Sequence, residues 1–202
     1  MWAVGSISGV TTIEKEKVLL ICIMFLSCDH FIAILSDLLR ICPQKVTKDD
    51  KAVVASCIMY VIQQYPNFLV RHWTFLKTVV NKNFEFMSEL HPGVQDMACD
   101  TFNKVVRKCY KEFLKEQLVK ENILEPPYII DIIRNTPTYT VNLNPQQQES
   151  YYRSIGIVIR AERNTETQQQ YLSTLITPFN QKWQAYMQQA ASMILVPFII
   201  SR

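Results

Sequence analysis

The side chain in this sequence that most resembles a reactive group is the thiol of Cys42. It stands at the end of an apolar run, residues 31–42, that has helical spacing. The C-terminal end of a helix does not favour a thiolate, although Lys45 and Lys48 nearby partly offset this effect. No histidine and carboxylate partner for Cys42 is visible, so we interpret the thiol as part of a groove wall. An enzyme that uses Cys42 is the remote alternative.

No other motif in the chain indicates catalysis. The patterns of P-loop, dinucleotide-binding, zinc-protease and serine-hydrolase sites are absent, and His30, His72 and His91 are scattered. We interpret His72, beside Trp73, as a packing or capping residue. The sequence therefore predicts no catalytic residue, no metal site and no cofactor.

The composition is that of a folded protein with helical elements. Of 202 residues, 49% are apolar and 19% are charged, which argues against disorder. The net charge of +3 is too small to indicate nucleic-acid binding by itself, and only four glycines disfavour an all-β fold or a phosphate-binding loop. Six cysteines without a CxxC pair indicate free thiols in a reducing compartment rather than a disulfide framework.

Prolines and polar clusters divide the chain into helical segments, and no strand pattern competes seriously with them. Thr136 to Asn144 is expected to be a loop, and a break is expected at Thr177-Pro178. Helix pairs recur about every 40–50 residues, which favours HEAT-type hairpins stacked into an all-α solenoid over a compact helical bundle. The predicted helices cover residues 29–42, 48–64, 66–90, 93–117, 128–135, 146–162, 165–176 and 178–192.

One apolar run, residues 18–28, does not fit this division. Its sequence, VLLICIMFLSC, is too short to cross a bilayer as a helix. It has the length of a signal-peptide core, but it is not N-terminal and no small-residue cleavage site follows. A buried helix and an insertion foreign to the fold both remain open.

Two of the predicted helices carry a second apolar stripe that packing against one partner helix would leave uncovered. Neighbouring helices with such stripes can form a groove for an amphipathic peptide. Lys82 lies within the second stripe, where its stem is expected to run along apolar surface. The stripes consist of Ile32, Leu35, Leu39 and Cys42 on the first helix, and Phe75, Val79 and Phe86 on the second.

Residues 57–109, beginning CIMYVIQQYPNFLVRHWTFLKTVV, closely resemble nuclear export receptors of the importin-β-like HEAT-repeat family. Residues 2–9 (WAVGSISG), 36–56 and 142–156 (NLNPQQQESYYRSIG) extend the resemblance, as does the region around 180–190. The resemblance implies an all-α solenoid of about four HEAT-type antiparallel helix pairs over residues 1–202. Within it, residues 18–28 are an insertion foreign to the family and 196–202 a divergent C-terminal tail.

The resemblance also implies a function. In this family, leucine-rich nuclear export signals of cargo proteins bind a hydrophobic groove between adjacent repeats. Export depends on the GTP form of the small GTPase Ran, which would mostly contact regions outside this segment. The whole receptor also meets nucleoporins and shuttles between nucleus and cytoplasm, with no direct nucleic-acid or membrane partner. A HEAT scaffold or non-functional fragment without an intact groove is the alternative.

The site residues implied by the resemblance fall largely on the two stripes. Cys42 matches the groove cysteine that covalent export inhibitors attack, and Lys82 the residue that filters peptide geometry. The groove residues are Ile32, Leu35, Leu39, Cys42, Ala55, Met59, Phe75, Val79, Phe86 and Met97, and the rim residues are Lys48, Lys51, Lys82 and Glu85.

Overall fold

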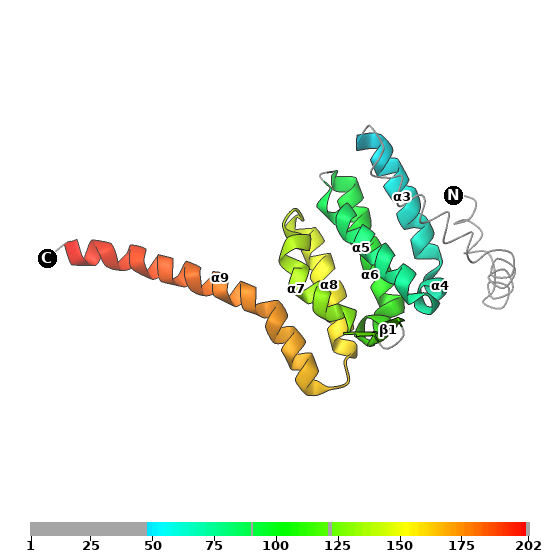
Figure 1. Ribbon diagram of the computed structural model, residues 1–202. Helices are drawn as coiled ribbons and strands as arrows, with labels where there is room; N and C mark the ends of the chain where they lie inside the picture. The colour runs from blue at the N-terminus through cyan, green and yellow to red at the C-terminus, as the bar shows by residue number, and fades with distance from the viewer. Residues whose placement is uncertain (1–47, 90, 121–122, 201–202) are drawn as a thin grey trace, which may run out of the picture.

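The computed structural model describes residues 48–89, 91–120 and 123–200, in which seven helices and one small hairpin follow one another (Figure 1). The helix predicted over residues 29–42 and the apolar run at 18–28 both lie outside the described residues. The elements are α3 (Lys48–Gln64), α4 (Pro66–Arg71), α5 (Trp73–Ser88), α6 (Pro92–Leu114), β1 (Gln117–Lys120), β2 (Ile123–Glu125), α7 (Tyr128–Thr140), α8 (Pro145–Ala161) and α9 (Thr165–Ile200).

Helices α5 to α8 stand side by side in a row, with α3 at one end of it and α9 leading away at the other (Figure 1). Helix α6 occupies the centre of the packing, because it contacts α3, α5 and α8. Side chains spaced three or four residues apart face these neighbours, as expected for amphipathic helices. This arrangement confirms the all-α, helical-repeat class predicted from the sequence.

The core between these helices is strongly aromatic. The ring of Phe84 on α5 stacks on Tyr139 of α7 at 4.1 Å and meets Phe102 of α6 edge-on at 5.0 Å. Phe102 in turn stacks on Tyr151 of α8 at 5.6 Å. Four helices therefore share one cluster, which we call the Phe84 cluster (Phe84, Phe102, Tyr139 and Tyr151).

The predicted single helix over 66–90 is wrong, because the chain breaks at His72. This residue leaves the helical region, with φ −123° and ψ 76°, and its N–H donates to the carbonyl of Leu69. The His72 ring packs on Phe68 with 4.3 Å between centroids. The packing role expected for His72 is confirmed, whereas its side chain makes no capping hydrogen bond to α5.

Two further predictions are wrong around the end of α6. The helix ends at Leu114 rather than near residue 117. Strands β1 and β2 form an antiparallel hairpin, where no strand was expected. Strand β1 has four residues and β2 has three. Strands of this length hold too little alternation to stand out in a sequence.

Two predicted helix breaks, at Pro137 and at Pro178, are absent from the structure. Helix α7 continues through Pro137 to Thr140, where a loop was predicted, and α9 runs through Pro178 as one helix where two were predicted. In both places threonine hydroxyls donate to carbonyls one turn earlier, as in Thr136 to Ile132 and Thr177 to Ser173. Each helix therefore continues past its proline, although the proline removes one backbone hydrogen bond.

Candidate functional site

The structure describes part of the predicted groove. Ala55 and Met59 lie on α3, Phe75, Val79 and Phe86 on α5, and Met97 on α6. These three helices contact one another, so the structure brings the described groove residues to one helical junction. Ile32, Leu35, Leu39 and Cys42 lie outside the described residues, as do the side chains of Lys48 and Lys51.

The apolar stripe of α5 is buried. Phe75, Val79 and Phe86 are 6%, 1% and 4% exposed, and Ala55 and Met59 on α3 are also buried. Met97 is half-buried. The three α5 side chains of the predicted stripe are therefore covered in this structure. A ligand at this junction would have to enter between side chains that are already packed.

The predicted rim residues Lys82 and Glu85 form an ion pair on α5. The side chain of Lys82 is only 13% exposed, that of Glu85 is 63% exposed, and the Lys82 ammonium lies 5.7 Å from the centre of the Phe86 ring. Lys82 therefore lays its stem on the apolar stripe, as predicted. A pair with one exposed partner is worth at most about 1 kcal/mol, so another carboxylate can replace Glu85 at low cost.

The opposite side of α5 is held by a contact set that the sequence reading missed. The Tyr128 hydroxyl at the start of α7 donates to Oδ1 of Asn81, and Trp73 meets the Tyr128 ring edge-on at 5.7 Å. The Lys77 ammonium lies 5.5 Å from that ring centre and 2.6 Å from a carboxylate oxygen of Glu125 in β2. We call these five residues the Tyr128 clamp.

One spacing pattern in the sequence indicated part of the Tyr128 clamp. Trp73, Lys77 and Asn81 recur every four residues and so share one face of α5. Burial, with nearby Tyr139 and Asp131, raises the pKa of Tyr128 above its ordinary value. Its hydroxyl therefore remains protonated and able to donate near neutral pH.

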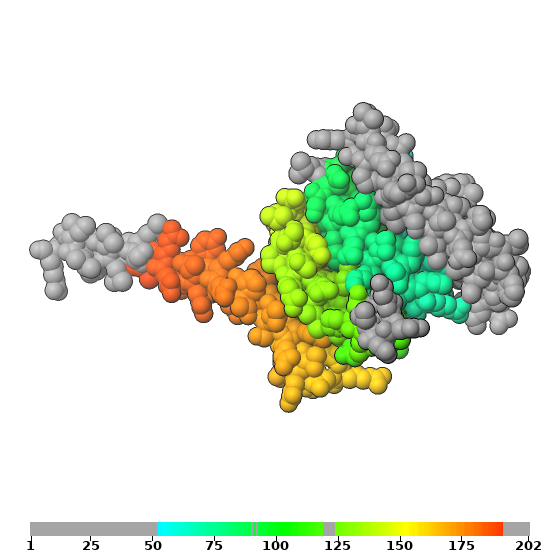
Figure 2. Space-filling model, in the orientation of Figure 1, coloured from blue at the N-terminus to red at the C-terminus, as the bar shows by residue number. Residues whose placement is uncertain are grey.

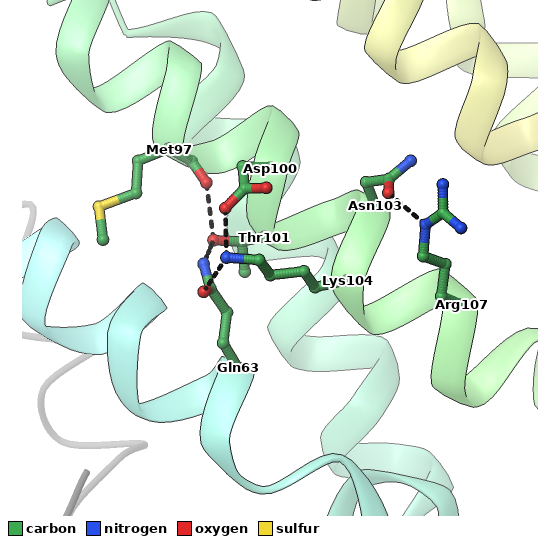
Figure 3. Close-up of polar contacts among 7 residues, drawn as sticks. All are labelled: Gln63, Met97, Asp100, Thr101, Asn103, Lys104 and Arg107. Atoms are coloured by element: carbon green, nitrogen blue, oxygen red, sulfur yellow. Dashed lines mark hydrogen bonds and ion pairs between the residues drawn. The ribbon is translucent and has the colours of Figure 1, made fainter. Parts of the chain in front are cut away.

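A polar network joins α3 to α6 beside Met97 (Figure 3). The Gln63 amide donates to Thr101 Oγ1 at 2.6 Å, and that hydroxyl donates to the Met97 carbonyl at 2.7 Å. Lys104 donates to Gln63 Oε1 at 2.9 Å and pairs with Asp100 at 2.7 Å. These bonds fix the α3–α6 spacing at the junction that carries Met59 and Met97.

Buried Asn83, next to Lys82, has one polar atom without a partner. Its Nδ2 donates to the Ala98 carbonyl at 2.8 Å, while its Oδ1 accepts no hydrogen bond. Leaving such an acceptor unpaired costs about 1–3 kcal/mol. The α5–α6 contact therefore holds an acceptor that a rearrangement of this junction could satisfy.

The described cysteines are free thiols, of which Cys99 and Cys109 are buried and Cys57 is exposed. Burial, together with the charge of Asp96, raises the pKa of Cys99 to about 12. Burial, together with Glu112, does the same for Cys109, to about 12. Both thiols are therefore poor nucleophiles near neutral pH. Cys22, Cys28 and Cys42 lie outside the described residues.

These differences predict selective alkylation. At pH 7.5 we expect iodoacetamide to modify Cys57 at least about tenfold faster than Cys99 or Cys109, since reaction needs both exposure and thiolate. Peptide mass spectrometry over a time course measures the three rates, and denatured protein, in which they should converge, is the control. Equal rates in the folded protein would contradict the burial of Cys99 and Cys109.

Among the described residues, no three His, Cys, Asp or Glu side chains gather as metal ligands. No helix in that part is both long and apolar enough to cross a membrane.

Comparison with known proteins gives a clear relationship. No family model matches the chain. It is 46% identical to Exportin-1 of Schizosaccharomyces pombe over 190 residues and 46% identical to Protein EXPORTIN 1A of Arabidopsis thaliana over 189, each match covering 94% of the chain. It is 40% identical to Exportin-1 of Drosophila melanogaster over 193 residues, or 96% of the chain. The chain spans only 16% of the length of the first two relatives and 17% of the third.

Proposed function

Because this chain is homologous to exportin-1 over nearly its whole length, we propose that it is the segment of a nuclear export receptor that binds leucine-rich export signals. The signal would lie in the groove between adjacent HEAT repeats that α5 borders. The observation that carries this proposal is the stripe of Phe75, Val79 and Phe86 with Lys82 laid along it, beside α3 and α6. Apolar pockets beside a cationic rim suit an amphipathic peptide with acidic flanks.

Because the α5 stripe is buried, peptide binding would require a more open conformation of the proposed groove. A peptide would bind by favouring a minor conformation in which α5 has moved relative to α3 and α6. We propose that the GTP form of Ran favours the same open conformation in the whole receptor, mostly through regions beyond this segment. Nucleoporins would bind the whole receptor, which would shuttle between nucleus and cytoplasm.

Lys82 would take part in recognition through its ammonium group. In the free chain that group pairs with Glu85 and faces the Phe86 ring. A peptide carboxylate or a carbonyl at the end of a peptide helix could exchange with Glu85, since the exposed pair is weak. The groove residues outside the described part, Ile32, Leu35, Leu39 and Cys42, would form the facing wall, with Lys48 and Lys51 on the rim.

Phe86→Ala tests this function. Truncating a central aromatic contact typically costs 2 kcal/mol or more, so we expect affinity for a fluorescein-labelled leucine-rich export peptide to fall about 30-fold or more. Fluorescence anisotropy with the chain in excess measures the affinity. Met97→Ala, at a half-buried position with less risk to folding, should also weaken binding.

Phe179→Ala is the matched control, because Phe179 is a 45% exposed ring on α9, away from the groove helices. It should leave peptide affinity unchanged, and circular dichroism establishes that each variant is folded. Unchanged peptide affinity in folded Phe86→Ala and Met97→Ala would reject the groove.

The second candidate is a HEAT scaffold without a working groove. The burial of Phe75, Val79 and Phe86 is the observation that favours it. It predicts no peptide binding even after residues 18–28 are deleted and the flanking repeats of the receptor are restored. The first candidate predicts binding in that longer protein.

A further inference from the structure

A cavity lies between α7, α8 and α9, away from the proposed groove. It encloses about 260 Å³ and receives side chains from all three helices. Pro137 of α7 and Pro178 of α9, two prolines that lie within helices, both line it. The space-filling view shows the surface where α7 meets the base of α9 (Figure 2). Two interior prolines therefore meet at one cavity.

Each proline leaves one backbone carbonyl without its helical partner. Proline has no N–H, so Pro137 cannot donate to the carbonyl of Ile133, and Pro178 cannot donate to that of Thr174. Ile133 and Thr174 both line the same cavity. The threonine hydroxyls nearby donate elsewhere, Thr136 to Ile132 and Thr177 to Ser173. The carbonyls of Ile133 and Thr174 therefore lack the N–H donor one turn ahead, and both residues belong to the cavity lining.

The remaining wall is mainly apolar and aromatic. Tyr152 of α8 and Phe179 of α9 meet edge-on at 5.3 Å, and Leu175 completes this side. An apolar cavity of about 150 Å³ accommodates benzene. A volume of about 260 Å³ is therefore suited to a two-ring aromatic group. Backbone acceptors within apolar walls favour an aromatic group that carries its own donor.

We propose that this cavity binds the indole side chain of tryptophan from a protein partner. The rings of Tyr152 and Phe179 would contact the indole, and its N–H would donate to the carbonyl of Ile133 or Thr174. This site is separate from the export-signal groove and does not depend on it.

The surroundings of the cavity favour a peptide over a free small molecule. Helix α9 also carries exposed apolar side chains next to lining residues in the sequence, Ile176 at 46% and Trp183 at 65% exposure, and these would be open to residues that flank the inserted tryptophan. Lys182 lines the cavity as its cationic residue. An acidic residue beside the tryptophan would therefore bind more favourably than a basic one.

Two matched probes test the proposal. The first is a short acidic peptide with 5-fluorotryptophan at its centre, and the second replaces tryptophan by 2-naphthylalanine, which has similar size but no N–H. Fluorine NMR line broadening gives the affinity of the first, and competition gives that of the second. One neutral hydrogen bond is worth roughly 3- to 10-fold, so the tryptophan peptide should bind tighter by that factor.

Proline variants identify the acceptors. Pro137→Ala and Pro178→Ala each restore a backbone N–H that can pair with the freed carbonyl, so the double variant should bring the ratio of the two affinities close to one. The ratio is the relevant quantity, because losing a proline ring from the wall weakens both peptides. Phe179→Ala should weaken both peptides while keeping their ratio.

Pro145→Ala is the matched control, because Pro145 opens α8, where the first N–H groups have no helical partner. It should leave both affinities unchanged. The proposal is overturned if neither peptide binds at millimolar concentration, if the wild-type ratio is near one, or if the double variant keeps the wild-type ratio. Free N-acetyl-5-fluorotryptophanamide should bind more weakly than the peptide, and equal affinity would reject the peptide source.

Discussion

Phe84→Ala is expected to lower the free energy of unfolding by about 3–5 kcal/mol, as truncation of a buried phenylalanine to alanine typically does. Phe84 is 2% exposed and its ring contacts Phe102, Tyr139 and Tyr151. The loss removes one side of a cluster to which four helices contribute. Since single domains are commonly stable by only 5–15 kcal/mol, this substitution should bring the chain close to unfolding at 37 °C.

Equilibrium urea unfolding, followed by circular dichroism at 222 nm, measures the change. Val53→Ala on α3 is the control, because Val53 is 64% exposed and its truncation should change stability by less than about 0.5 kcal/mol. The midpoint should fall in Phe84→Ala while the slope stays constant. A loss below about 1 kcal/mol would mean that the Phe84 cluster does not unite the repeats.

The sequence predicted best those helices whose ends carry local signals. Helix α3 was predicted to end at residue 64 and ends at Gln64, with Pro66 just beyond it. Helix α8 begins at Pro145 because Asn144 and Gln147 form a capping box, with 2.9 Å between Gln147 N and Asn144 Oδ1. Such signals act within a few residues, so they can be read without tertiary structure.

Predictions failed where tertiary packing overrode a local sequence rule. A loop was predicted from Thr136 to Asn144, yet Thr136 and Thr140 are buried and their hydroxyls donate to carbonyls of α7. A proline inside a helix costs about 3 kcal/mol, which burial of the surrounding apolar face can exceed. The sequence of residues 128–144 alone does not indicate how much of the α7 surface α8 and α9 will bury.

The candidate site shows the same limit. Helical spacing found Phe75, Val79 and Phe86 as one stripe, but their burial depends on neighbouring helices and could not be predicted. The Tyr128 clamp was missed because Asn81 and Tyr128 are 47 residues apart. The spacing of Trp73, Lys77 and Asn81 indicated a shared face of α5 without indicating what would cover it.

Tyr128→Ala should be as severe as Phe84→Ala, with an expected loss of about 3–5 kcal/mol in the free energy of unfolding. Tyr128 is 5% exposed, and its ring contacts Trp73 and Phe113 in addition to the Lys77 ammonium. Urea unfolding gives the magnitude. Leu124→Ala, at a 56% exposed position in β2, is the control and should change stability by less than about 0.5 kcal/mol.

Tyr128→Phe separates the role of the clamp in stability from its role in the proposed groove. It removes only the hydrogen bond to Asn81, so its expected cost is about 0.5–1.5 kcal/mol and the ring contacts remain. The clamp holds the face of α5 opposite to Phe75, Val79 and Phe86. Loosening the clamp should therefore make it easier for α5 to move relative to α3 and α6. If peptide binding requires that movement, Tyr128→Phe binds an export peptide a few-fold more tightly while being less stable. Weaker or unchanged peptide binding in the folded variant would mean that α5 does not have to move for the groove to open.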